Sequence, residues 1–132
     1  MDQQQVRDYL LKKPFALETF PYGDGVSVFK AKHKMFATLS FGKMDDGHCE
    51  SADTGGNIYW VNLKCDPQEA IMLRGLFPSV IPGYHMSKIH WNTIKLDGSV
   101  PYEEIQRMID NSFKLVFSNM TKEDQQSILF NL

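Results

Sequence analysis

The sequence lacks the short motifs that assign a reaction directly. It contains no GxGxxG or GxxxxGK(S/T) phosphate-binding loop and no GxSxG nucleophile elbow. No apolar run is long enough to cross a bilayer, and the first five residues are neither basic nor apolar, so they do not resemble a secretory signal. We therefore expect a cytoplasmic protein that makes no membrane contact.

Cysteine is scarce. Cys49 and Cys65 are the two cysteines, and no CxxC spacing joins them. This favours a reduced intracellular protein, with a Cys49–Cys65 disulfide as the alternative. Cys65 directly precedes an expected helix start, where a thiol pKa can fall, but a buried cysteine at a strand end is the simpler interpretation.

Metal-binding patterns are weak. His85 and His90 flank a tight turn that Asp97 could approach, and His48, Cys49 and the pair 45–46 form a second acidic group. Neither group has a recognised ligand spacing, and metal sites normally need three or four convergent ligands. We expect no metal and interpret His85 and His90 as polar residues of a hairpin.

Excess positive charge is also lacking. The 132 residues carry a net charge of -2, with 42% hydrophobic and 23% charged residues. This composition is typical of one folded domain, here residues 1–132. A protein that binds nucleic acid over its whole surface is usually basic, so any such binding must depend on a local patch.

The order of expected elements indicates an α+β fold. Helical periodicity appears over residues 3–13, from 66 to 77 and after Pro101, and apolar alternation predicts strands at 26–32, 35–41, 58–65 and 91–96 with a short strand before the last. Residues 14–25 and 43–57 are expected to be loops. The prediction is a two-layer fold in which helices pack on an antiparallel sheet, in the order α-β(3)-α-β(2)-α.

The second helix has a strong predicted start. Asp66 can cap it, Pro67 suits its first position, and Glu69 can complete a capping box. Its expected buried face is Ala70, Leu73, Leu76 and Phe77. The helix after Pro101 has the clearest apolar stripe in the chain, and Thr121 is expected to cap a short final helix.

Two predicted hairpins gather basic side chains. The first turns at His33 and Lys34, and the second turns around residues 87–89. Lysines of this kind can contact phosphates, but they also keep exposed sheet edges from pairing with other chains. The candidate nucleic-acid-binding residues are Lys30, Lys32, Lys34, Lys88, Lys95, His85, His90 and Asn92.

Three segments together resemble the MmcQ/YjbR family. They are residues 34–40 (KMFATLS), 61–70 (VNLKCDPQEA) and 82–101 (PGYHMSKIHWNTIKLDGSVP), and the runs at 21–23 and 109–113 are similar to it as well. The resemblance extends from the first helix to about residue 117 and leaves out the last dozen residues. It implies a secretion-chaperone-like α+β fold and a predicted DNA-binding role through two wings, mapping here onto the two hairpins. It implies no enzymatic activity or cofactor.

Three hypotheses follow. The first is duplex DNA binding, with the five candidate lysines on phosphates and His85, His90 and Asn92 as further polar contacts. The second is a protein-interaction or chaperone-like module, suggested by aromatic residues and methionines near turns. The third and least favoured is a small-molecule binder or enzyme that uses a pocket between Tyr84 and Asp97. The side chains behind the second hypothesis are Tyr22, Met44, Tyr84 and Met86, and those behind the third are Tyr84, His85, His90, Asn92 and Asp97.

Overall fold

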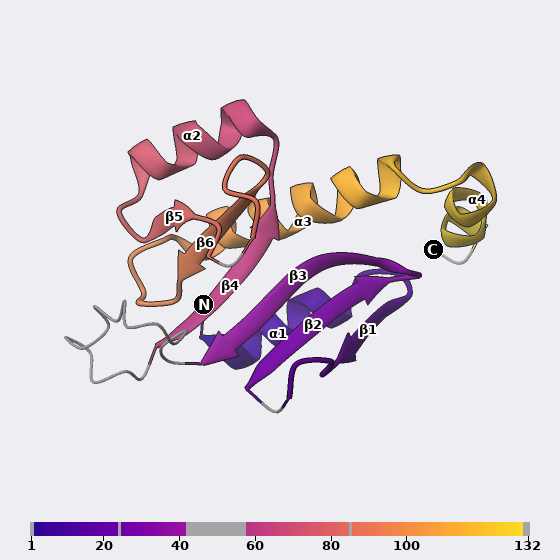
Figure 1. The fold of residues 1–132 in the computed structure, drawn as a ribbon, viewed down its shortest axis with the longest axis horizontal. Helices are drawn as coiled ribbons and strands as arrows, with labels where there is room; N and C mark the ends of the chain where they lie inside the picture. Colours follow the sequence, from indigo (N-terminus) through magenta and orange to yellow (C-terminus); the bar gives the residue numbers. More distant parts are fainter. Residues whose placement is uncertain (1, 24, 42–57, 85, 131–132) are drawn as a thin grey trace.

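A six-stranded antiparallel sheet forms the centre of the fold (Figure 1). The computed structural model describes residues 2–23, 25–41, 58–84 and 86–130. Within them the strand order is β1-β2-β3-β4-β6-β5, and each neighbouring pair is antiparallel. The elements are α1 (Gln3–Leu11), β1 (Ala16–Thr19), β2 (Val26–Ala31), β3 (Lys34–Phe41), β4 (Tyr59–Lys64), α2 (Pro67–Leu76), β5 (Val80–Pro82), β6 (Trp91–Lys95), α3 (Tyr102–Ser118) and α4 (Lys122–Phe130).

The helices cover one face of the sheet. In Figure 1, α1 lies behind β1–β3, α3 runs along the same face, α2 lies over β5 and β6, and α4 lies beyond the end of α3. The core fills the space between these helices and the sheet. Its largest fully buried side chains include Phe29, Phe36, Leu39, Ile94 and Ile109. The predicted α+β class with helices packed on an antiparallel sheet is therefore confirmed.

A bulge in β3 fastens α3 to the sheet. Phe29 pairs with Ala37 but Lys30 pairs with Met35, so Phe36 is the extra residue. Its ring meets Phe113 of α3 edge to face at 5.5 Å. Its carbonyl accepts a hydrogen bond from Ser112 Oγ at 2.6 Å, and Ser112 Oγ accepts one from the backbone N–H of Lys64 at 2.9 Å. One buried hydroxyl thus joins α3, β3 and β4.

The expected loop at residues 14–25 contains a strand. β1 pairs with β2 from Ala16 opposite Ala31 to Thr19 opposite Val28, so the order is α-β(4)-α-β(2)-α-α rather than α-β(3)-α-β(2)-α. Four residues are too few for alternation to stand out beside the turn-forming residues around them. The short strand before β6 is β5, which ends at Pro82, and Tyr84 lies in a turn. The expected 43–57 loop lies outside the described residues, and so does Cys49.

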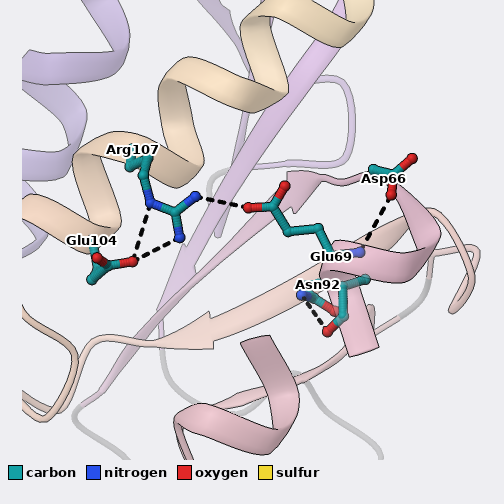
Figure 2. A network of polar contacts seen from close by, with 6 residues as sticks. Asp66, Glu69, Asn92, Glu104 and Arg107 are labelled. Carbon is teal, nitrogen blue, oxygen red and sulfur yellow. Dashed lines mark hydrogen bonds and ion pairs between the residues drawn. The ribbon is translucent and has the colours of Figure 1, made fainter. Parts of the chain in front are cut away.

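The ends of α2 and α4 differ in part from expectation. Asp66 caps α2 by accepting from the backbone N–H groups of Gln68 and Glu69, as predicted. Glu69 does not complete a capping box, because its carboxylate binds Arg107 of α3 at 2.7 Å (Figure 2). Leu76 is 62% exposed rather than buried. The cap of α4 is confirmed, since Thr121 Oγ1 accepts from the Asp124 N–H at 3.1 Å.

Candidate nucleic-acid interface

Both predicted wings lie at the same end of the sheet. Wing one is the turn of residues 32 and 33 between β2 and β3, and wing two is residues 83–90 between β5 and β6, of which residue 85 lies outside the described residues. Ala37 pairs with Leu63 and Lys64 pairs with Trp91, so β3 begins where β4 ends and β6 begins. β3 and β6 are two strand spacings apart, about 10 Å.

Wing one is held by contacts with distant parts of the chain. Lys32 adopts a left-handed backbone conformation, with φ at 61°, which lets the chain reverse within two residues. Its ammonium donates to Ser127 Oγ of α4 at 3.0 Å and lies 4.0 Å from the centre of the Phe15 ring. The charge of Lys32 is therefore directed toward α4, whereas His33 and Lys34 are exposed.

Wing two is held from beneath by Arg74 of α2. The Arg74 guanidinium donates to Asn92 Oδ1 at 2.7 Å and to the carbonyl of Lys88. The Asn92 amide donates in turn to the carbonyl of Ala70 at 3.3 Å, so Asn92 is buried beneath α2 (Figure 2). Because the Arg74 cation binds a backbone carbonyl of wing two, the conformation of wing two depends on the position of α2.

Backbone bonds complete wing two. The N–H of Gly83 donates to the Trp91 carbonyl at 2.9 Å, and that of Trp91 donates to the Ser87 carbonyl at 3.0 Å. A Cβ at Gly83 would lie 2.7 Å from Cβ of Trp91, so the close approach of these two backbone segments requires glycine at position 83. Lys88 and His90 stay exposed, and Lys88 Nζ donates to the Gly83 carbonyl at 3.0 Å.

The structure separates the predicted site residues into those exposed at the wing end and those placed elsewhere. Lys34, Lys88 and His90 are exposed at the wing end of the sheet, and Lys30 is half-buried on the face of the sheet that carries no helices. The other described members are placed elsewhere, and His85 lies outside the described residues. Lys32 is bound to α4, Asn92 is buried under α2, and Lys95 pairs with Trp60 at the opposite end of the sheet.

The structure places Lys95 and Asn92 apart from the exposed residues of the wings. Trp60 pairs with Ser40 on one side and Lys95 on the other, several residues from the wings along each strand. Lys95 Nζ lies 5.9 Å from the centre of the Trp60 ring, over the indole face. Asn92 is 2% exposed. Asn92 is therefore shielded from solvent, and Lys95 lies at the opposite end of β6 from wing two.

The helix-free face of the sheet carries a buried polar row. Asn62 donates to Thr38 Oγ1 at 3.1 Å and accepts from the Thr93 hydroxyl, and the Tyr84 N–H donates to Thr93 Oγ1 at 2.9 Å. Trp60 lies on the same face, and its buried Nε1 has no acceptor in the part of the chain that the structure describes.

Two residues that sequence reasoning missed belong to the wing end. Lys64 extends the alternation of Trp60 and Asn62 and therefore lies on the helix-free face beside Trp91. Within the described strands the charges on this face are Lys30, Lys64 and Lys95, because Glu18 turns to Arg7 of α1. Period-two alternation could have indicated Lys64, but no local signal indicates Arg74.

The described members of the predicted pocket do not converge. Asn92 points to Arg74, the Tyr84 ring packs on Trp60 at 5.8 Å, and Asp97 accepts from Ser79 and Ser99. These described members therefore do not support the small-molecule hypothesis at Tyr84–Asp97, and His85 lies outside the described residues. Among the described residues no three His, Cys, Asp or Glu side chains are grouped to hold a metal ion.

Cys65 lies at the foot of wing two. Its N–H donates to the His90 carbonyl at 2.8 Å, and its thiol is buried. Burial, and then the nearby carboxylates of Glu69 and Asp66, raise the pKa of this thiol to about 11. The expected buried cysteine at a strand end is confirmed. The raised pKa disfavours the thiolate, which is the reactive form.

Comparisons with known proteins agree on one family. A family model described as YjbR matches residues 11–115. "Uncharacterized protein YbdF" of Escherichia coli O157:H7 is 29% identical over 132 residues, covering 97% of this chain and 98% of that protein. "Uncharacterized protein YyaQ" of Bacillus subtilis (strain 168) is 41% identical over 70 residues, covering 53% of this chain and 52% of that protein.

Solved structures show the same fold. The crystal structure of Deinococcus radiodurans protein DR2400, described as a DUF419 domain, superposes with a TM-score of 0.78 at 31% identity, covering 96% of this chain and 87% of that one. A crystal structure of a Pseudomonas syringae protein has a TM-score of 0.69 at 29% identity, covering 87% and 98%. In the part of this chain that the structure describes, no helix is both long and apolar enough to span a membrane.

Proposed function

Since this chain belongs to the YjbR family, with a match over residues 11–115, we propose that it binds duplex DNA with the wing end of its sheet. The observation that supports the proposal is the register of the sheet, which brings wing one and wing two to one end. Two projections at the same end of one sheet can contact one duplex together, whereas projections at opposite ends could not.

The charges available at this end set the strength of binding. Lys34 and Lys88 are exposed there, and Lys30 and Lys64 add charge from the helix-free face. Among the described residues none of these four lysines forms an ion pair. About four phosphate contacts give a slope of about -3.6 in log affinity against log salt, which is a loss of about 100-fold between 50 and 200 mM.

A salt titration with matched variants tests the proposal. Fluorescence anisotropy of a labelled mixed-sequence duplex is measured for the wild type, for the single variants Lys34→Gln and Lys95→Gln, and for the double variant Lys34→Gln with Lys88→Gln. Each lost phosphate contact lowers the salt slope by about 1, so the double variant is expected to lose about 2. Lys95→Gln removes the same kind of charge at the opposite end and is expected to keep the wild-type slope.

Two results would contradict the proposal. One is no saturable binding at about 100 μM protein in low salt, which is the weak end of the non-specific range. The other is an equal loss of slope in Lys95→Gln and in the single variant Lys34→Gln. That result would mean that the overall charge matters rather than the wings.

An apolar surface along β1 supports a second candidate, binding of an extended protein segment. β1 is an edge strand, pairing only with β2 among the described strands. The exposed apolar side chains around it are named the β1 belt. Its exposed members are Leu11, Phe15, Leu17, Phe20 and Tyr22. An exposed edge with apolar side chains is the surface that strand addition uses.

A lysine substitution on the exposed edge of β1 tests whether the β1 belt binds a protein. Leu17→Lys places a charge on the unpaired strand, and Leu129→Lys places one on α4, where the leucine is equally exposed. If the β1 belt binds a protein, a partner that co-purifies with the wild type is lost with Leu17→Lys and kept with Leu129→Lys. A partner that remains bound to Leu17→Lys eliminates the belt as its site.

A further inference from the structure

Wing two exposes one large apolar side chain between two polar ones. Ile89 is 63% exposed, and its neighbours Lys88 and His90 are exposed as well. A single exposed apolar residue is common on protein surfaces and needs no explanation by itself. The position of Ile89 is what matters, because it lies on a proposed DNA-binding projection between two side chains that can donate hydrogen bonds to phosphates.

The backbone on both sides of Ile89 is fixed. The carbonyl of Lys88 accepts from Arg74 of α2, and the carbonyl of His90 accepts from the Cys65 N–H at 2.8 Å. The N–H of His90 also donates to Ser87 Oγ at 3.4 Å. Ile89 is therefore carried by a turn that is tied to α2 on one side and to the end of β4 on the other.

The side chain itself suits insertion into an apolar space. Isoleucine is β-branched, so few χ1 rotamers are available to it and little rotamer freedom is lost on contact. Proteins that kink DNA commonly place an isoleucine, leucine, methionine, phenylalanine or proline between base pairs and hold the flanking phosphates with polar side chains.

We propose that Ile89 is a wedge that inserts between two base pairs and kinks the duplex, with Lys88 and His90 on the adjacent phosphates. This inference rests on the proposed DNA binding and adds a deformation of the DNA to it. A flexible pyrimidine–purine step is the ligand feature that it favours, because such steps are the easiest to unstack.

An exposed isoleucine on α2 provides the matched control. Ile71 lies on that helix and is 66% exposed, nearly the same as Ile89. Ile71 is therefore an isoleucine of equal exposure without phosphate-binding neighbours in sequence, since Ala70 and Met72 flank it.

Energy transfer between dyes on the two ends of a duplex tests the wedge. DNA has a persistence length of about 150 base pairs, so a free duplex of about 20 base pairs with a central TA step is nearly straight. Saturating wild-type protein is expected to raise the transfer efficiency, as a kink of about 20–90° brings the ends closer. Ile89→Ala is expected to lose this rise while keeping the salt slope of binding, and Ile89→Leu and Ile71→Ala are expected to keep the rise.

The outcomes separate the wedge from the proposed function. Absence of binding by the wild type would overturn both. Salt-dependent binding without a change in transfer would overturn the wedge and leave the DNA proposal standing. A rise that Ile89→Ala retains in full would also overturn the wedge, because the bend would then arise without the side chain.

Discussion

In wing one the ammonium of Lys32 donates to Ser127, 95 residues later in the chain, whereas in wing two the ammonium of Lys88 donates to Gly83, five residues earlier. Wing one is therefore shaped by α4 and by the Phe15 ring. Wing two is shaped by its own turn and by Arg74 beneath it. The two hairpins have similar numbers of basic residues in the sequence. The lysine of wing one contacts a distant helix, whereas the lysine of wing two contacts its own turn.

The difference shows that a lysine in a turn is not automatically available to a ligand. The ammonium of Lys32 is already paired with a hydroxyl and an aromatic face, so moving it to a phosphate would break both contacts. Lys34 has no such contact among the described residues, although it lies two positions away. Substituting the residues that fix the conformation of each wing tests this difference between the two wings.

Arg74→Ala is expected to have the largest effect. The change removes a charged donor from Asn92 Oδ1 and from the Lys88 carbonyl and leaves a buried acceptor unpaired. The bond to Asn92 is part-buried and the bond to the Lys88 carbonyl is exposed, so the first dominates the cost. A hydrogen bond to a charged group contributes about 1.5–3 kcal/mol, so we expect the free energy of unfolding to fall by about 2–3 kcal/mol. Urea denaturation with an unchanged m-value is the measurement.

Arg107→Ala is the matched control for that measurement. Arg107 also bonds to two residues, Glu69 and Glu104, but it is exposed to solvent (Figure 2). Exposed ion pairs contribute about 0.2–1 kcal/mol each, so this change is expected to cost about 1 kcal/mol. Equal costs for the two arginines would mean that Arg74 does not hold wing two.

Gly83→Ala is expected to have the next largest effect. The new Cβ would approach Trp91 Cβ to 2.7 Å and the Trp91 carbonyl oxygen to 3.0 Å, and the backbone cannot move aside easily. Such overpacking costs about 1–3 kcal/mol. Gly75→Ala lies on α2 with open space around it, so it is expected to stabilise the protein by about 0.5–1 kcal/mol. Thermal unfolding of both variants gives the comparison, and two shifts of the same sign would contradict it.

The sequence predicted the parts of the fold that depend on local pattern. The apolar stripe of α3, the Asp66 cap and the four longer strands follow from periodicity and side-chain chemistry within a few residues. β1 was missed because four residues are too short to show a period. Leu76 was misplaced because it lies at the flank of the helical stripe, where Leu73 and Phe77 make the contact with the core instead.

The candidate site was only partly predictable. Lys34, Lys88 and His90 are exposed at the expected wings because turn residues usually face solvent. The partners of Lys32 and Asn92 come from α4 and α2, and no pattern near either residue identifies them. Lys95 was grouped with the wings because strand alternation gives the face of a residue but not the end of the sheet at which it lies.

Lys32→Gln is expected to separate stability from binding at wing one. Loss of the ammonium removes the contact with the Phe15 ring and weakens the bond to Ser127. A cation–π contact at an exposed site contributes about 0.5–1 kcal/mol, so the expected cost is about 1 kcal/mol in urea denaturation. The salt slope of DNA binding is expected to stay near the wild-type value. A loss of slope equal to that of Lys34→Gln would show that Lys32 leaves α4 to contact phosphate.

Asp97→Asn is expected to have the smallest effect, at the open end of the hairpin that carries wing two. Asp97 accepts hydrogen bonds from Ser79, before β5, and from Ser99, after β6. Burial alone would raise the pKa of Asp97, but these hydrogen bonds outweigh it and hold the pKa below the usual 3.8.

A carboxylate with a lowered pKa in the folded state stabilises the protein above its unfolded pKa, and that contribution is lost as the pH falls through the folded pKa. Asp97 is exposed, so solvent screening limits the contribution to less than about 1 kcal/mol. Urea denaturation should therefore show the wild type more stable than Asp97→Asn at about pH 7, with the difference shrinking below about pH 4. A difference that stays constant down to about pH 2 would mean that the geometry of the side chain, and not its charge, holds this end of the hairpin closed.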